Sequence, residues 1–105
     1  MKVAVVSSDG KVINQHFGKA SRFLIFEVDK GKIRFIESRD NKPVCGSAED
    51  GHSDNALERT ISWISDCEVL LCSRIGGGAE EALRKKGIRP IEAHDFIEEV
   101  LRQMM

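Results

Sequence analysis

Three side chains that could bind a metal lie in two loop segments of this sequence: His16 in "NQHFGK", and Cys45 and His52 in "PVCGSAEDGH". A neutral imidazole is a common metal ligand, and a thiolate binds soft metals or iron–sulfur clusters. Each residue also has a structural interpretation: a loop hydrogen bond for His16, a plain loop thiol for Cys45, and a surface or capping contact for His52. Gly18 adds to the first segment, because a residue without a side chain lets a bulky ligand approach the backbone.

The spacing of these donors argues against a permanent zinc site. The sequence contains neither a C-x-x-C motif nor two histidines at i and i+4, so a closed tetrahedral site is not expected. What remains is an open set of one to three donors. Such a set suits a metal cluster that is held transiently better than it suits a structural metal.

A glycine triplet forms a second candidate site. Gly76, Gly77 and Gly78 follow Arg74 in "SRIGGGAEE" and precede a helical pattern. The free N–H groups and the dipole at a helix amino terminus favour an anion, and Arg74 would add a cationic donor. The segment lacks the lysine and hydroxyl of a P-loop and is not G-x-G-x-x-G, so nucleotide binding is not expected. A tight strand-to-helix turn is the alternative interpretation, and the sequence leaves both open.

The sequence offers little for catalysis. It contains no nucleophile elbow, and Asp9, Asp54 and Asp66 share no evident face. A nuclease would need several carboxylates converging on two metal ions, and the first predicted strand carries no central acid. Cys67 and Cys72 bracket an apolar run, where buried cysteines behave as small hydrophobic residues. We therefore expect a binding protein rather than an enzyme.

Hydrophobic patterns predict the strands and helices that position these residues. Apolar runs predict strands at residues 3–6, 22–28, 32–38, 68–72 and 88–91. Helical spacing predicts helices from residue 54 or 55, at 79–86 and at 95–103, the first and last of which begin with the capping pairs Asn55–Glu58 and Asp95–Glu98. Residues 29–31, "DKG", predict a hairpin with a bulge.

The order of these elements predicts an α/β fold with a mixed five-stranded sheet. The predicted order is β-β-β-α-β-α-β-α, in which the alternating second half requires right-handed parallel crossovers. The simplest arrangement places the first strand in the centre, the hairpin on one side and the later strands on the other. Pro90 indicates that the last strand lies at an edge, because proline lacks the N–H that an inner strand needs.

Composition limits the class of protein. At 105 residues the chain has the length of one domain, spanning 1–105, and its formal net charge of −1 gives no basic excess for nucleic acid. No apolar run approaches membrane-spanning length, and the amino terminus is not typical of a signal peptide. The three cysteines follow no disulfide framework. We therefore expect a reduced, cytoplasmic protein.

Three segments of the sequence, taken together and in this order, resemble one family. They are "DGKVINQHFGKASRFLIFEV", "PVCGSAEDGH" and "ISDCEVLLCSRIGGGAEEALRKKGIRPIEA". They look like the dinitrogenase iron–molybdenum cofactor biosynthesis family, the group of NifX-like proteins, the carboxy-terminal domain of NifB and the NafY core. The triplet histidine–phenylalanine–glycine and the stretch arginine–isoleucine–glycine carry most of the resemblance.

The resemblance implies a ribonuclease-H-like fold without nuclease activity and a carrier role. The implied cargo is an iron–sulfur cluster precursor or the finished iron–molybdenum cofactor, passed between cofactor-assembly proteins. The family's cofactor-associated histidine corresponds to His16 in "QHFG", and its loop cysteine corresponds to Cys45. His52, Gly18 and residues 74–78 are candidate site residues because of their chemistry alone, and the resemblance does not add to them.

The expected partners are cofactor-assembly proteins, without nucleic acid or membrane, and the expected state is a monomer or weak homo-oligomer. The rival hypothesis is a metal-free module that docks or regulates partner proteins through the same mid-chain loop.

Overall fold

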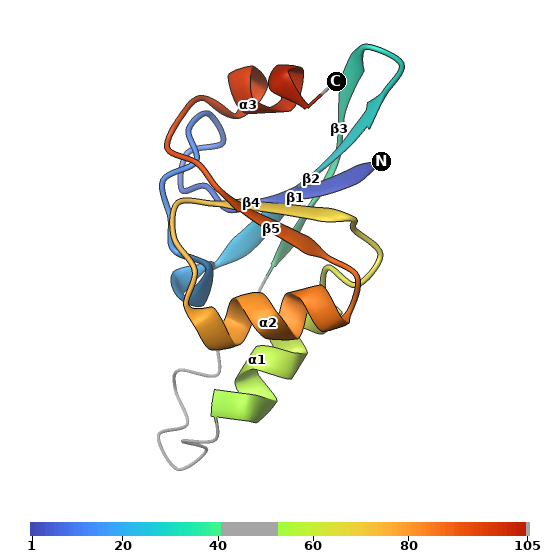
Figure 1. The fold of residues 1–105 in the computed structure, drawn as a ribbon. Helices are drawn as coiled ribbons and strands as arrows, with labels where there is room; N and C mark the ends of the chain where they lie inside the picture. Colours follow the sequence, from blue (N-terminus) through green and yellow to red (C-terminus); the bar gives the residue numbers. More distant parts are fainter. Residues whose placement is uncertain (41–52, 105) are drawn as a thin grey trace.

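The structure, a computed structural model, describes residues 1–40 and 53–104 (Figure 1). In chain order the elements are β1 (Lys2–Val5), the short 3-10 helix η1 (Phe17–Lys19), β2 (Arg22–Asp29), β3 (Lys32–Asp40), α1 (Ser53–Ser62), β4 (Val69–Cys72), α2 (Gly77–Lys85), β5 (Arg89–Glu92) and α3 (Ile97–Gln103). The predicted strands and helices are all present, and their ends differ from the predictions by up to two residues.

The strands form one mixed sheet in the order β3-β2-β1-β4-β5. β1 pairs antiparallel with β2 and parallel with β4, and β4 pairs parallel with β5. The predicted arrangement is therefore confirmed: the first strand is central, the hairpin lies on one side, and the strand with Pro90 is an edge. This mixed α/β sheet is the part of the fold prediction that the structure bears out.

Each face of the sheet has its own core. Alternation along β1 and the residue after it sends Ala4 and Val6 to the face that α1 and α2 cover, and Val3 and Val5 to the face that α3 covers. Figure 1 shows α1 and α2 together on one side of the sheet and α3 alone on the other. The residues of β4 are buried on both sides, as expected for a strand between two layers.

The hairpin turn is shorter than predicted. Asp29 pairs with Lys32, so the connection consists of Lys30 and Gly31, whose φ angles are 49° and 77°. Positive φ at both central residues is typical of a two-residue type I′ turn, which matches the twist of the strands. The bulge lies within the strands instead, where the register shifts between Ile25 and Phe26.

The two predicted capping boxes are wrong. α1 begins at Ser53, so Asn55 lies within its first turn. α3 begins at Ile97, and its N-cap residue, Phe96, makes no side-chain capping bond. The Oδ1 atom of Asp95 accepts a hydrogen bond from the N–H of Phe96 instead, at 2.7 Å.

Long-range backbone pairing explains why α3 starts late. The carbonyl of Asp95 accepts the N–H of Ile13 at 3.0 Å, and the N–H of Ile97 donates to the carbonyl of Lys11 at 2.9 Å. The backbone at residues 95–97 is thus paired with the loop after β1. Among the described residues, no helix is long and apolar enough to cross a membrane.

A salt-bridge network holds the end of β3 to the turn after α1. The guanidinium of Arg39 donates to both carboxylate oxygens of Asp66, at 2.6 and 2.9 Å, and to Glu37. The hydrogen bonds from Arg39 hold the pKa of Asp66 well below its ordinary range, and Lys2 adds to the effect. Asp66 therefore serves as an ionised structural contact.

We expect Asp66→Asn to lower the melting temperature by roughly 2–5 °C near neutral pH, since a surface ion-pair network contributes about 1 kcal/mol or less. The folded state binds the Asp66 proton more weakly than the unfolded state, so this stability is present above the unfolded-state pKa of about 3.9. It is lost as the pH falls toward the folded-state value.

Thermal unfolding monitored by circular dichroism at several pH values checks this expectation. The difference in melting temperature between wild type and Asp66→Asn should disappear in acid. Glu81→Gln, which removes one exposed pair with Lys85, is the control and should leave the melting temperature nearly unchanged. A difference in melting temperature that stays constant down to strong acid would contradict the stabilising role of ionised Asp66.

Candidate functional site

His16 lies beside Arg74, although 58 residues separate them in the chain. The two residues form an isolated parallel β-bridge, in which the N–H of Phe17 donates to the carbonyl of Arg74 at 2.9 Å and the N–H of Ser73 donates to the carbonyl of Gln15 at 3.0 Å. Both His16 and Arg74 are exposed. The structure therefore brings the predicted histidine and the predicted arginine segment together at one edge of the sheet.

The residue after His16 anchors this bridge in the core. Phe17 is buried with the residues under α1 and α2, and its ring centroid lies 6.1 Å from that of Phe23. His16 itself has extended backbone angles at the start of η1. The chain therefore buries the phenylalanine and leaves the preceding imidazole on the surface.

Upstream, the loop from β1 is held by two acceptor side chains. The hydroxyl of Ser7 is buried and accepts the N–H of Gly10 at 3.0 Å, where φ is +78°. The carboxylate of Asp9 accepts the N–H groups of Lys11 and Val12 at 2.9 and 3.1 Å, and these bonds lower its pKa. Asp9 thus organises the loop that leads to His16.

On the other side of the bridge, the turn from β4 to α2 is fixed at both ends. The N–H of Ile75 donates to Oε2 of Glu92, at the end of β5, over 3.0 Å. The N–H of Glu80 donates to the carbonyl of Gly76 at 2.9 Å and closes the first turn of α2. The N–H groups at the start of α2 have no partner within the helix, as in any α-helix.

Arg74 is an available cation at this edge. Among the described residues it makes no ion pair, whereas Glu80, in the first turn of α2, is paired with Arg84 at 3.1 Å. The guanidinium is therefore free to meet an anionic guest beside the first turn of α2.

The glycines at this edge lie on open surface. A Cβ atom added at Gly18, Gly76, Gly77 or Gly78 would meet no atom within 4 Å, and none of the four has a positive φ. Neither backbone strain nor crowding therefore requires glycine here, and the space beside the backbone is open to a guest.

Comparison with known proteins identifies the family of this chain. The family described as "Dinitrogenase iron-molybdenum cofactor" matches residues 1–105. The chain belongs to this family. It is 41% identical over 103 residues to the FeMo cofactor biosynthesis protein NifB of Frankia alni, covering 97% of this chain and 20% of that protein. It is 34% identical over 89 residues to the protein NifX of Klebsiella pneumoniae, covering 85% of this chain and 54% of that protein.

These curated relatives are longer than the chain, which spans about a fifth of the NifB proteins it matches. Solved structures share the fold. The apo orange protein of Desulfovibrio gigas aligns with a TM-score of 0.65 at 23% identity, over 98% of this chain and 86% of that one. A putative NifB protein from Thermotoga aligns with a TM-score of 0.58 at 19% identity, over 98% and 85%.

Two of the predicted metal ligands, Cys45 from the family resemblance and His52 from its chemistry alone, lie outside the described residues. Within the described residues, no group of three or more histidine, cysteine, aspartate or glutamate side chains could hold a metal ion. The described part of the site therefore offers one imidazole, one guanidinium and open backbone. These groups fit a guest that needs few protein ligands.

The other two cysteines do not belong to this site. Cys67 and Cys72 are both buried in the core, as predicted from their apolar setting. Burial raises the pKa of Cys67 to about 12, helped by the charge of Asp66, and burial raises the pKa of Cys72 to about 11, helped by Glu92. Both remain neutral thiols at physiological pH and are poor metal ligands.

Sequence reasoning missed two residues of this edge. Glu92 is a surface glutamate in sequence, and its bond to Ile75 spans 17 positions, so no local pattern indicates it. Gln15 precedes His16, and its Oε1 atom is buried with no hydrogen-bond partner among the described groups, which the sequence does not indicate.

We expect the thiols of Cys67 and Cys72 to resist labelling in the folded protein, because burial keeps them neutral and covered. In Cys45→Ala, a chromogenic thiol reagent at neutral pH should give no signal until denaturant is added, and should then report both cysteines. Rapid labelling of the folded variant would contradict this burial.

We expect Glu92→Ala to release the turn at Ile75, whereas Glu92→Gln retains an acceptor oxygen. Amide hydrogen exchange followed by NMR should show the Ile75 amide exchanging roughly three to ten times faster in Glu92→Ala, as the loss of one hydrogen bond of about 1 kcal/mol implies. The Glu92→Gln variant should remain close to wild type. Equal exchange in all three proteins would show that Glu92 does not hold the turn.

Proposed function

We propose that this domain is a non-enzymatic carrier for an iron–sulfur or iron–molybdenum type cluster, or its precursor, during cofactor assembly. Its family is one of iron–molybdenum cofactor biosynthesis. The observation that supports the proposal most is the bridge between His16 and Arg74. It joins the exposed imidazole-bearing residue to an exposed arginine that makes no ion pair among the described residues.

The two residues have complementary roles in this proposal. The imidazole of His16, in its neutral form, binds one metal of the cluster through a ring nitrogen. The guanidinium of Arg74 donates hydrogen bonds to the anionic face of the same cluster, where charge-assisted bonds are the stronger kind.

Backbone groups complete the proposed cluster-binding site. The N–H groups of Gly77 and Gly78 open α2, where the helix dipole favours negative charge. Gly18 and Gly76 leave room for a large guest to approach the main chain. Cys45, and with it His52, would add donors from the mid-chain loop.

A small number of ligands suits a carrier, because a cargo must also leave. Each additional protein ligand slows release, and a closed four-ligand site would retain its metal. The buried thiols of Cys67 and Cys72 do not compete for the cargo. The proposal also includes a ribonuclease-H-like architecture, which the family resemblance implies and which the sheet order fits. It further includes a cytoplasmic location.

Anaerobic loading with iron and sulfide, or with isolated cofactor, tests the proposal. We expect the wild type to acquire visible absorption with matching metal and sulfide content. His16→Ala and Cys45→Ala should each weaken cluster binding at least about tenfold, because even supporting residues of metal sites cost 10- to 100-fold. Arg74→Gln should remain coloured but bind more weakly, and its binding should depend less on salt.

The matched control is His94→Ala, which removes another exposed histidine. This variant should load like the wild type. A wild type that stays colourless, or equal loading in His16→Ala and His94→Ala, would contradict the carrier proposal.

A further inference from the structure

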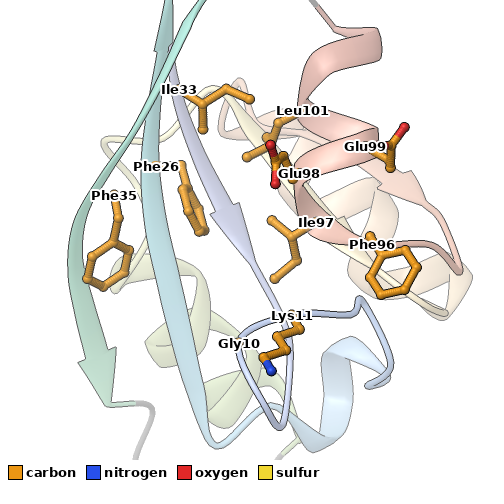
Figure 2. A pocket seen from close by; sticks show the side chains of 10 residues that line it. All are labelled: Gly10, Lys11, Phe26, Ile33, Phe35, Phe96, Ile97, Glu98, Glu99 and Leu101. Atoms are coloured by element: carbon orange, nitrogen blue, oxygen red, sulfur yellow. The ribbon is translucent and has the colours of Figure 1, made fainter.

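An apolar groove lies on the face of the sheet opposite α1 and α2, between the β2–β3 hairpin and α3. It has a volume of about 560 Å³, and its floor consists of Phe26, Ile33, Ile97 and Leu101. Figure 2 shows these side chains between two aromatic walls, Phe35 on β3 and Phe96 before α3.

The walls of this groove are unusually exposed for aromatic residues. Phe35 is 53% exposed and Phe96 is 58% exposed, the two highest values among the exposed large apolar side chains of the described residues. The ring of Phe35 packs edge-on against Phe26 at 5.5 Å between centroids, so the wall and floor form one surface. Both exposed rings therefore border the same hollow.

The groove exists because the two faces of the sheet are covered unequally. α1 and α2 both pack on one face, whereas α3 alone covers the other (Figure 1). α3 buries Ile97, Val100 and Leu101 in a core that also holds residues of β1, β2 and β4. It does not fully cover the β3 side of that face, where Ile33 is half-buried and Phe35 stays exposed.

We propose that this groove is the interface of a homodimer, in which a second copy of the chain packs across a two-fold axis through it. A two-fold interface must be complementary to itself, with a projection and a hollow on the same patch. Phe96 is the projection and the space beside Phe26 and Phe35 is the hollow. Each copy inserts its Phe96 into the hollow of the other.

The groove carries both positive and negative side chains, which favours a second copy of the chain over a uniformly basic or uniformly acidic partner. Lys11 closes one end, and Glu98 and Glu99 lie along α3. Glu98 is already paired with Arg102, whereas Lys11 and Glu99 make no ion pair among the described residues. A two-fold axis sets Lys11 of each copy against Glu99 of the other, whereas a uniformly basic or acidic partner meets a like charge at one end.

The patch is small, so the dimer is weak. Ten residues line the groove, fewer than the roughly 20–30 residues a side of a standard interface. Dimerisation is therefore expected at high protein concentration. The interface leaves the cluster-binding edge open, because neither His16 nor Arg74 lines the groove.

Sedimentation velocity over a wide range of protein concentration tests the proposal on the full chain. The wild type should shift from monomer to dimer as the concentration rises. Phe96→Ser should raise the dimer dissociation constant at least about tenfold, as expected for a central aromatic contact. Trp63→Ser, which removes an exposed aromatic away from the groove, is the matched control and should dimerise like the wild type.

Charge reversal gives a test that misfolding cannot imitate. Lys11→Glu and Glu99→Lys should each weaken dimerisation alone, and an equal mixture of the two variants should form a heterodimer through the restored opposite charges. Circular dichroism confirms that each variant is folded.

A wild type that stays monomeric at every concentration, or variants that do not complement one another, would overturn the proposal. Capture of an assembly protein by the groove, without self-association, would overturn it in favour of a heterologous partner. Cluster loading should be unchanged in Phe96→Ser, so the dimer and the carrier proposals fail independently.

Discussion

The backbone bridge between residues 15–17 and residues 73–74 is the constraint on which the candidate site depends. Its two hydrogen bonds contribute only about 1 kcal/mol each, because both strands could bond to water instead. Burial of the Phe17 side chain contributes about 1.5–3 kcal/mol and occurs at one place in the core. The apolar anchor therefore decides the position of the loop, and the bridge sets its register. His16 is held beside Arg74 as a consequence.

This arrangement separates the reactive groups of the chain by their environment. The thiols of Cys67 and Cys72 lie in the core, where burial raises their pKa and keeps them neutral. The imidazole of His16 and the guanidinium of Arg74 lie on the surface at the edge where β4 ends. The Arg39–Asp66 contact ties the end of β3 to the turn after α1. The apolar groove occupies a different face, so a partner can dock there without covering this edge.

The sequence predicted the sheet well, because its signals act locally. Alternating and continuous apolar runs identified the strands, and the connection order placed the first strand in the centre. The helix starts were predicted less well. The Asp95–Glu98 pattern is a valid local capping signal, yet the backbone at residues 95–97 pairs with Lys11 and Ile13, and this long-range pairing delays α3. Tertiary hydrogen bonds outweighed a local motif.

The candidate site was predictable in its residue types and not in its assembly. Histidine, arginine and glycine could be singled out by chemistry, but the contact of His16 with Arg74 links positions far apart in the chain. Glu92 could not be found at all, since a surface glutamate gains its role from the backbone N–H that folding brings to it. Cys45 and His52 were predicted on chemistry and lie outside the described residues, so both remain predictions.

Pulsed electron paramagnetic resonance on the loaded protein, reduced to a paramagnetic state, tests the direct bond between His16 and the cargo. We predict nitrogen modulation from a coordinated imidazole in the wild type and in His94→Ala, and its disappearance in any cluster that His16→Ala still retains. Nitrogen modulation that persists without the imidazole of His16, or that is absent from the loaded wild type, would contradict the central claim.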